Sequence, residues 1–348
     1  MTSILRLLLC LTFILLPAAA RAVEPERPGQ EDFLTTAVYA EDRLYLLSDA
    51  GQLFSLTEAD HEARREDAGA KVRDICKVDG DLVALTAGAT AESVVLRRHT
   101  AQGWAAAVPI AVKKDEGRTL FCEGKSAMLL TDTRLITVAA GQTSELALKG
   151  DIRWGLPATL ATPDAIYLGI NRGEWGGGLQ RIDRATGEIT QVEDMIPDSC
   201  KGLLNTNCDP VNGLAVLPWR PDCIAAAIGL IHFYGHGRIV TICGDKIERL
   251  YVKQFGERSP NKNLPEDEAY QTIPFYGLMP AGDKLMAVGV DGLYTFDSSG
   301  AATFETMPAF KTIGPFHVSF ARPDMILVLT SVNSRMSIGG AVPMLVAR

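Results

Sequence analysis

Short apolar runs, each ended by a turn, set the pattern of this chain. The runs are mostly five to seven residues long, and Gly, Pro or Asp separates them. Few stretches show the spacing of apolar residues that an amphipathic helix requires. Runs of this length, bounded by turn residues, predict many short antiparallel strands. The pattern therefore predicts an all-β protein.

A degenerate repeat organises these strands. In seven segments a short turn precedes an apolar strand, and the segments are spaced by 39, 44, 39, 58, 61 and 41 residues. Another short strand comes before most copies, a third strand comes after them, and a fourth is often visible. The residues that mark the turns are Asp42, Asp81, Lys125, Asp164, Asp222, Asp283 and Asp324.

Seven units of four strands predict a β-propeller with seven four-stranded blades. Each blade of a propeller packs between two neighbours, so its strands bury side chains on both faces. Several strands fit this, because they are apolar without clean alternation, as in residues 165–170. Six or eight blades, or a pair of β-sandwiches, are the alternatives for so degenerate a repeat.

One hairpin resembles the outer strands of quinoprotein-type and related bacterial propellers. It carries the pattern Asp183-x-x-Thr186-Gly187, and a looser version begins at Asp297. Asp bonds its own backbone in such a turn, and Gly supplies positive φ. The resemblance, which extends to streptogramin-lyase-like propellers, implies the fold alone. Position 191 holds Gln where the quinoprotein blade motif has a docking tryptophan, and no quinone or calcium set is recognisable.

The first 22 residues predict a secretory signal peptide. Arg6 precedes an apolar stretch, residues 7–16, and Ala20-Arg21-Ala22 forms an A-x-A cleavage site. A retained membrane anchor is the alternative, but the apolar stretch is too short to span a bilayer. We therefore expect residues 23–348 to form one propeller domain, exported to the periplasm or the exterior, without stable membrane insertion.

The net charge of the chain limits the classes of partner that it is expected to bind. Without the two arginines of residues 1–22, the chain has 32 (34 − 2) Lys and Arg against 42 Asp and Glu, a formal charge of −10. An acidic chain with no basic run argues against binding to nucleic acid or to anionic membrane surfaces.

Six cysteines follow the signal segment, and an even number in an exported chain predicts disulfides. No C-x-x-C occurs, which argues against a zinc ribbon. Six cysteines allow 15 pairings, and the strand order narrows them. Two cysteines close a nine-residue loop, two flank one hairpin, and two occupy equivalent places in neighbouring blades. The predicted pairs are Cys200–Cys208, Cys223–Cys243 and Cys76–Cys122.

Blade topology predicts two unlike faces. With strands A to D in each blade, the A–B and C–D turns lie at one end, the tight-turn face. The B–C loops and the connections to the next blade lie at the other, the loop-rich face. The longest and most unusual segments, from blades 4 to 7, fall on the loop-rich face, where a rigid scaffold typically carries function.

The segment NRGEWGGGL, residues 171–179, is the B–C loop of blade 4. It is not a phosphate-binding loop, since it lacks G-x-x-x-x-G-K-[ST] and a strand follows. Its glycines suit a hairpin turn and close backbone approach. One interpretation places Arg172, Glu174 and Trp175 over the central opening as ligand contacts. The other is a surface hairpin with Trp175 packed on its neighbour.

Other candidate residues share that face. Tyr234 and Arg335 lie in loops of blades 5 and 7, and Asp209, Asn212 and Tyr276 lie where strands enter near the axis.

Histidines are the remaining chemical candidates. His232 and His236 share one hairpin tip, where two imidazoles could bind a divalent metal or act as acid and base. No third ligand is recognisable, so no metal site and no cofactor are predicted. We expect one of the two to be packed and one solvated. His317 is interpreted as a hydrogen-bonded interior histidine rather than a base in the channel, and His61 as part of a solvated outer loop.

Catalytic motifs are missing: the sequence has no G-x-S-x-G, no H-E-x-x-H and no EF-hand loop. We therefore expect a non-catalytic propeller that binds a protein, peptide or glycan across the loop-rich face of blades 4 to 7. The alternative is a lyase or lactonase-like hydrolase that uses Glu174 with His232 or His236. A third hypothesis is a purely structural component of the cell envelope.

Overall fold

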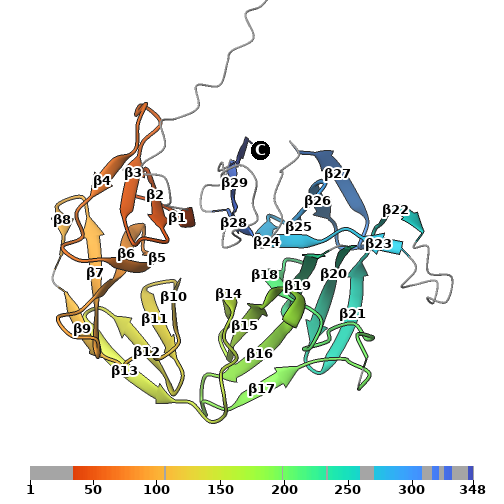
Figure 1. Ribbon diagram of the computed structural model, residues 1–348, viewed down its shortest axis with the longest axis horizontal. Coiled ribbons are helices and arrows are strands. Elements are labelled where there is room, and N and C mark those ends of the chain that lie inside the picture. Colours follow the sequence, from red (N-terminus) through yellow and green to blue (C-terminus); the bar gives the residue numbers. More distant parts are fainter. Residues whose placement is uncertain are drawn as a thin grey trace, which may run out of the picture. The chain divides into compact units, whose positions relative to one another are not determined.

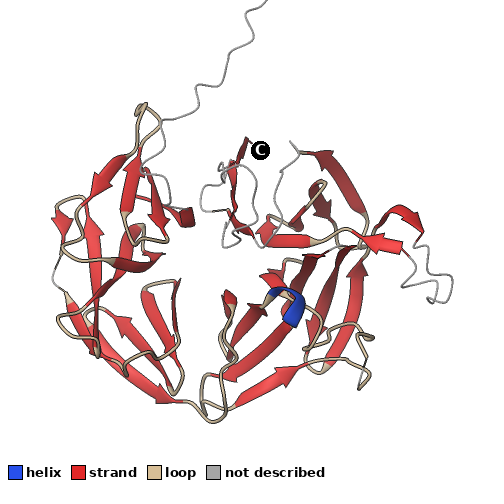
Figure 2. Cartoon of the chain, in the orientation of Figure 1, coloured by secondary structure: helices blue, strands red, loops and turns tan. Residues whose placement is uncertain are grey.

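Strands make up nearly every element in the described part of the chain (Figure 2). A computed structural model describes residues 34–105, 107–197, 199–232, 234–258, 270–307, 316–320, 325–330 and 344–347. One short 3₁₀ helix, η1 (Gly173–Trp175), is the exception among these residues. None of the described residues forms a helix long and apolar enough to cross a membrane. The predicted all-β class is confirmed.

Seven antiparallel sheets follow one another along the described residues and fan around a common centre (Figure 1). Blades 1 and 2 contain β1 (Leu34–Ala40), β2 (Arg43–Ser48), β3 (Leu53–Leu56), β4 (Arg64–Glu66), and β5 (Val72–Val78), β6 (Asp81–Ala87), β7 (Ser93–Thr100), β8 (Gly103–Trp104), β9 (Val108–Ala111). Blades 3 and 4 contain β10 (Arg118–Glu123), β11 (Ser126–Thr131), β12 (Arg134–Ala139), β13 (Gln142–Ala147), and β14 (Leu156–Ala161), β15 (Ala165–Asn171), β16 (Gly177–Asp183), β17 (Ile189–Val192).

The later blades follow the same plan. Blades 5 and 6 contain β18 (Val211–Leu217), β19 (Arg220–His232), β20 (Tyr234–Cys243), β21 (Lys246–Tyr251), and β24 (Phe275–Ala281), β25 (Lys284–Gly289), β26 (Gly292–Phe296), β27 (Ala302–Thr306). A two-stranded ribbon, β22 (Gln254–Arg258) with β23 (Tyr270–Thr272), lies between them in the chain. The described strands of blade 7 are β28 (Phe316–Ser319), β29 (Met325–Thr330) and β30 (Met344–Ala347).

Neighbouring strands in the chain pair with each other in the described blades, except that β8 and β9 of blade 2 both pair with β7. Each blade is thus an up-and-down sheet with its first strand innermost. Successive innermost strands contact one another from β1 round to β28, and β28 contacts β1. The predicted seven-bladed propeller is therefore confirmed.

The core lies in layers between blades. On β15, Ile166, Leu168 and Ile170 pack with buried residues of blade 3, while Tyr167 packs against the cluster shared with blade 5. Full burial of one such aliphatic side chain stabilises the fold by roughly 1.5–3 kcal/mol. Because both faces of these strands are buried, their sequences are continuous apolar runs.

Side-chain packing closes the ring between the first and last blades. Ala37 of β1 is buried with Leu327 and Leu329 of β29. The Ser319 hydroxyl donates to the Ala37 carbonyl at 3.1 Å. The described contacts thus join blades 1 and 7 through apolar burial and one buried hydrogen bond.

All three expected disulfides are present. Cys76–Cys122 joins the innermost strands of blades 2 and 3, Cys200–Cys208 closes a loop, and Cys223–Cys243 crosses the hairpin of β19 and β20. Each bridge typically stabilises a fold by ~2–4 kcal/mol.

Two local expectations need correction. Asp222 lies inside β19 rather than in a turn, because the strand begins at Arg220 beside a register shift in β18. The charged run near His61 is not only an outer loop, since residues Arg64–Glu66 form β4, the fourth strand of blade 1. His61 itself is exposed in the bend before this strand.

The side chain of Asn212 ties three blades together near the axis. Its Nδ2 donates to the Gly229 carbonyl at 2.8 Å in blade 5 and to the Phe275 carbonyl at 2.9 Å in blade 6. Its Oδ1 accepts from Asn171 Nδ2 of blade 4 at 2.5 Å. One amide therefore links β18 and β24, the innermost strands of blades 5 and 6, to the end of β15 in blade 4.

We expect Asn212→Ala to lower the free energy of unfolding by ~2–4 kcal/mol, because two carbonyls and the Asn171 amide lose their partner near the axis. Chemical denaturation of the oxidised protein measures this. Gln191→Ala, which removes one bond to Leu179 O, is the control and should cost less. An Asn212→Ala variant as stable as wild type would contradict the assigned role.

Candidate functional site

The segment 171–179 folds as a short turn on the loop-rich face. The Gly173 N–H bonds Asn171 Oδ1 at 2.7 Å, and the Gly176 N–H bonds the Gly173 carbonyl at 3.1 Å, which winds η1. The Arg172 N–H then donates to the Gly176 carbonyl at 2.9 Å and closes the hairpin. Contacts between η1 and β19 bring this turn beside the hairpin of blade 5.

The three consecutive glycines allow the turn to approach the next loop closely. Gly176, Gly177 and Gly178 have φ of 71°, 139° and 82°. A Cβ on Gly176 would lie 2.3 Å from the Asn207 carbonyl carbon. Backbone N–H groups of Gly177 and Gly178 donate to the Thr206 and Asp209 carbonyls at 3.0 and 2.9 Å. The glycines therefore serve backbone contact with the loop that Cys200–Cys208 closes.

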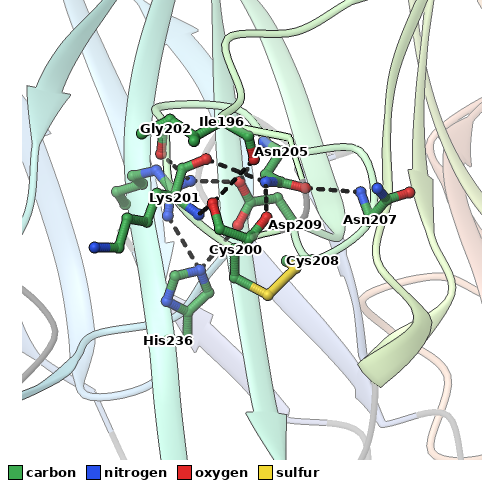
Figure 3. Close-up of a disulfide and its surroundings, with 11 residues drawn as sticks. Ile196, Cys200, Lys201, Gly202, Asn205, Asn207, Cys208, Asp209 and His236 are labelled. Atoms are coloured by element: carbon green, nitrogen blue, oxygen red, sulfur yellow. Dashed lines mark hydrogen bonds and ion pairs between the residues drawn. A yellow bond between two sulfur atoms is a disulfide. The ribbon is translucent and has the colours of Figure 1, made fainter. Parts of the chain in front are cut away.

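That disulfide loop has a buried polar interior (Figure 3). Asp209 is fully buried, and its Oδ2 accepts from the Asn205 backbone N–H at 2.6 Å and from the Arg238 guanidinium. Its Oδ1 lies 2.9 Å from His236 Nε2. Arg238 also donates to the Leu203 carbonyl at 2.8 Å. Blade 5 thereby fixes the loop that supports η1.

Burial lowers the pKa of Arg238, and the charge of Asp209 opposes this effect. The guanidinium stays charged at any physiological pH, because its ordinary pKa lies far above that range. The pair is therefore a permanent ionic link between the disulfide loop and β20.

Trp175 stands exposed on this support. Its exposed fraction is 71%, which is the highest among the exposed large apolar residues of the described chain. Five of those six residues lie in segments that end on the loop-rich face of blades 4 to 6, namely Leu156, Trp175, Ile196, Val252 and Phe255. We call these five the loop-face apolar set.

The other candidate residues differ in their exposure to a ligand. Arg172 and Glu174 are exposed in the same turn as Trp175. Asp209 and Tyr276 are buried, so neither side chain is open to a surface ligand. Asn212 lines the central cavity, but its amide is engaged by the three bonds described above. The side chains of His232 and Tyr234, and the whole of Arg335, lie outside the described residues.

The proposed acid–base set comes together only in part. η1 carries Glu174 beside β19, which ends in His232. His236 is partly exposed, and its Nε2 lies within hydrogen-bond distance of both Asp209 and Arg238. Among the described residues, no group of three His, Cys, Asp or Glu side chains is placed to hold a metal ion.

A central cavity of about 1280 Å³ runs between the innermost strands. Five cationic side chains line it: Lys77 toward the tight-turn end of β5, and four beside the loop-rich end of blades 2 and 3, namely Lys71, Arg73, Lys114 and Arg118. The sequence analysis missed them because they are scattered over nearly fifty residues of plain-looking blades. In the sequence, the four residues share only a position near the start of an innermost strand.

Asp74 lies beside these cations and lines the same cavity. Enclosure by the protein raises its pKa to about 6, although N–H groups of Leu120 and Ile75 bond the carboxylate at 3.0 and 2.9 Å and oppose the rise. The carboxyl group is therefore more easily protonated in the folded state than in the unfolded chain.

His317 also lines the cavity, from β28. Its side chain is exposed to the cavity and makes no hydrogen bond with the described residues, so the expected hydrogen bond stays a prediction. Surrounding protein lowers its pKa because the charged imidazolium is poorly solvated there. His317 is therefore a neutral side chain near pH 7.

No protein-family model matches the sequence. No curated protein matches it either. The structure, however, is similar to solved propellers.

The extracellular domain of a putative one component system, BT4673 from B. thetaiotaomicron, aligns with a TM-score of 0.51 and 16% identity over 87% of this chain. This chain spans only 38% of that protein. YCF48 bound to D1 peptide aligns with a TM-score of 0.55 and 11% identity, covering 86% of this chain and 88% of that one. The RRP9 WD40 repeats align with a TM-score of 0.56 and 8% identity, covering 92% and 96%. At these identities the likeness is one of fold, and the protein is a β-propeller.

We expect Gly176→Ala to destabilise the protein more than Gly173→Ala. Both residues have positive φ, which costs an alanine ~1–2 kcal/mol. Only at Gly176 does the added Cβ also collide with the 207–208 backbone, whereas at Gly173 it meets nothing within 4 Å. Unfolding free energies of the two variants measure the difference, and equal losses would contradict the close approach.

The pKa of Asp74 predicts a pH-dependent stability difference. Since the folded state binds the Asp74 proton more tightly, ionisation costs folding free energy as pH rises from about 4 to 7. The stability of Asp74→Asn relative to wild type should therefore improve across this range. Denaturation midpoints at several pH values measure the change.

Asp164→Asn is the control for this titration. Hydrogen bonds from Thr162 and Arg181 lower the pKa of Asp164, so it titrates below the same range. Its difference from wild type should stay constant between about pH 4 and 7. A constant difference for Asp74→Asn as well would refute the raised pKa.

Proposed function

We propose that this protein is an exported binding propeller that receives a protein or peptide partner on its loop-rich face, with Trp175 as the central anchor. The observation that carries the proposal is the 71% exposure of Trp175 on a turn held by hydrogen bonds, by a disulfide loop and by a buried ion pair. A large exposed aromatic on a rigid support is the residue type that dominates interface energy.

Rigidity supports a binding role in a second way. Association costs conformational freedom, and a support that is ordered beforehand avoids part of that cost. η1 is tied to the 205–209 loop through two backbone bonds, and that loop is tied to Arg238 of β20. The Trp175 backbone is therefore already positioned when a partner arrives.

The loop-face apolar set supports a macromolecular partner. Its five members come from blades 4 to 6, so a ligand that covers several of them must span more than one blade. Exposed apolar side chains gathered on one face of a soluble protein are typical of an interaction surface.

Export is supported by the chemistry of the cysteines. All six cysteines after the predicted signal peptide are joined in disulfides, which persist in oxidising compartments. Among proteins of similar fold, one is an extracellular domain and another is bound to a peptide. We infer a binding rather than a catalytic role, because Nε2 of His236 is engaged with Asp209 and Arg238.

We expect a photo-crosslinker at position 172 to capture the partner, and mass spectrometry to identify it as a polypeptide. A crosslinker at Lys125, on the tight-turn face of blade 3, should not capture it. If the partner captured at position 172 is a glycan, the assignment of the face stands, but the partner is not a polypeptide. Equal capture at both positions would refute the assignment of the face.

Trp175→Ala should weaken binding of the captured partner by at least about tenfold, since central aromatic anchors commonly contribute 2 kcal/mol or more. Its melting temperature should stay close to wild type, because the side chain is mostly exposed. Phe304→Ala is the matched control: Phe304 is 44% exposed but lies in β27, the outermost strand of blade 6. Titration calorimetry measures both, and an equal loss in the two variants would contradict the proposal.

A further inference from the structure

We propose that the loop-rich mouth of the central cavity, on blades 2 and 3, is a separate site for an anionic ligand that carries two or more carboxylate or phosphate groups. Lys71, Arg73, Lys114 and Arg118 form this site, which we call the cationic mouth. It is independent of Trp175, which lies in blade 4.

Contacts between the blades place these residues at one level. The Leu120 N–H donates to Asp74 Oδ2 at 3.0 Å, and Cys76 bonds Cys122. Both links join residues 46 positions apart, so β5 and β10 run side by side with a constant offset. Lys71 and Arg73 lie just before Asp74 in the chain, and Arg118 lies two residues before Leu120, so cations of both blades stand near the same end of these two strands. Lys114 follows from the connection that leads into β10, and all four line the one cavity.

None of the four makes an ion pair with a carboxylate of the described chain. Lys71, Arg73 and Lys114 are exposed to solvent, and none of their side chains donates a hydrogen bond to another described residue. The Arg118 Nε donates to the Glu116 backbone carbonyl at 3.1 Å, which orients the guanidinium without neutralising it. The positive charge of the cationic mouth is thus available to a ligand.

The carboxylates that line the same cavity are Asp49, Asp74, Asp115 and Glu116. Two of them are already engaged near the mouth. Glu116 is buried and accepts from the Lys113 N–H at 2.9 Å and from the Thr133 hydroxyl. Asp74 accepts from two backbone N–H groups. Hydrogen bonds from the backbone and a hydroxyl thus engage these two carboxylates, and neither forms an ion pair with one of the four cations.

Gathering cations has a cost that a ligand would offset. In a chain of formal charge −10 after the signal segment, an arginine or lysine easily finds a carboxylate on the surface, as Arg98 does with Asp81. Like charges held together repel, and the rigid disulfide-linked strands prevent them from separating. Arginine pairs with carboxylate and phosphate through two parallel bonds, which suits a ligand with several such groups.

The cavity also provides room. Its volume of about 1280 Å³ exceeds the space that drug-sized ligands commonly occupy, roughly 300–1,000 Å³. A di- or trivalent organic anion can enter from the loop-rich end and reach side chains of both blades.

Calorimetry with citrate and with pyrophosphate tests the site on oxidised protein at about 20 mM salt, where screening is weak. We expect binding of at least one of these probes and weaker binding of acetate, which offers a single charge. Citrate alone would indicate a carboxylate ligand, and pyrophosphate alone a phosphate ligand. Affinity should fall at about 200 mM salt.

Two double variants locate the site, Lys71→Gln/Arg73→Gln on blade 2 and Lys114→Gln/Arg118→Gln on blade 3. Each should weaken binding by at least about tenfold, because each removes two charge-assisted partners. Lys125→Gln/Lys284→Gln is the matched control, since it removes two exposed cations at the tight-turn face that do not line the cavity. It should leave the affinity within about twofold.

The proposal is overturned if no probe binds at concentrations up to about 10 mM, far above the millimolar constants of weak ligands. It is equally overturned if the control variant loses as much affinity as the mouth variants, because binding would then follow net charge alone. Melting temperatures without ligand show that each variant is folded before it is titrated.

Discussion

The need to bury both faces of every sheet governs this protein. A blade has apolar residues on its two sides, so it is stable only between two other blades, and the ring must close for the first and last blades to meet the same requirement. Ala37 against Leu327 and Leu329 meets it with apolar contacts, while the Ser319 hydroxyl satisfies a buried carbonyl. Apolar side chains fill most of the space between blades in this way, which leaves the strand ends, the loops and the central cavity for contact with a ligand. The two proposed sites lie in these places.

The same constraint explains how much of the fold the sequence predicts. Strand length, turn residues and two-sided apolar runs are local properties, and they lead to seven blades and to the three cysteine pairs. The errors are also local. The strand β19 begins before Asp222 because a register shift in β18 moves the turn to residues 218–219. Such a shift depends on packing between two strands, which neither strand encodes by itself.

The sites are harder to predict because they depend on distances between blades. The NRGEWGGGL segment shows this: its glycines predict a hairpin turn and a close backbone approach, and only the structure identifies the approaching backbone as that of residues 206–208. Trp175 was recognisable as a candidate because tryptophan beside glycine is unusual. The cationic mouth was not, because Arg73 and Arg118 are far apart in sequence and line one cavity only because β5 and β10 lie side by side.

The Asp209–Arg238 pair connects stability with the proposed binding face. A buried ion pair contributes little net stability, since desolvation offsets most of its attraction, but it discriminates strongly against arrangements that separate the charges. Here the separated arrangement would be a displaced 200–209 loop, with a carboxylate left buried and unpaired. The pair therefore fixes the position of the loop more than it strengthens the fold. η1 takes its place from that loop through Gly177 and Gly178, so the orientation of the Trp175 backbone depends on a charge pair in the interior of blade 5.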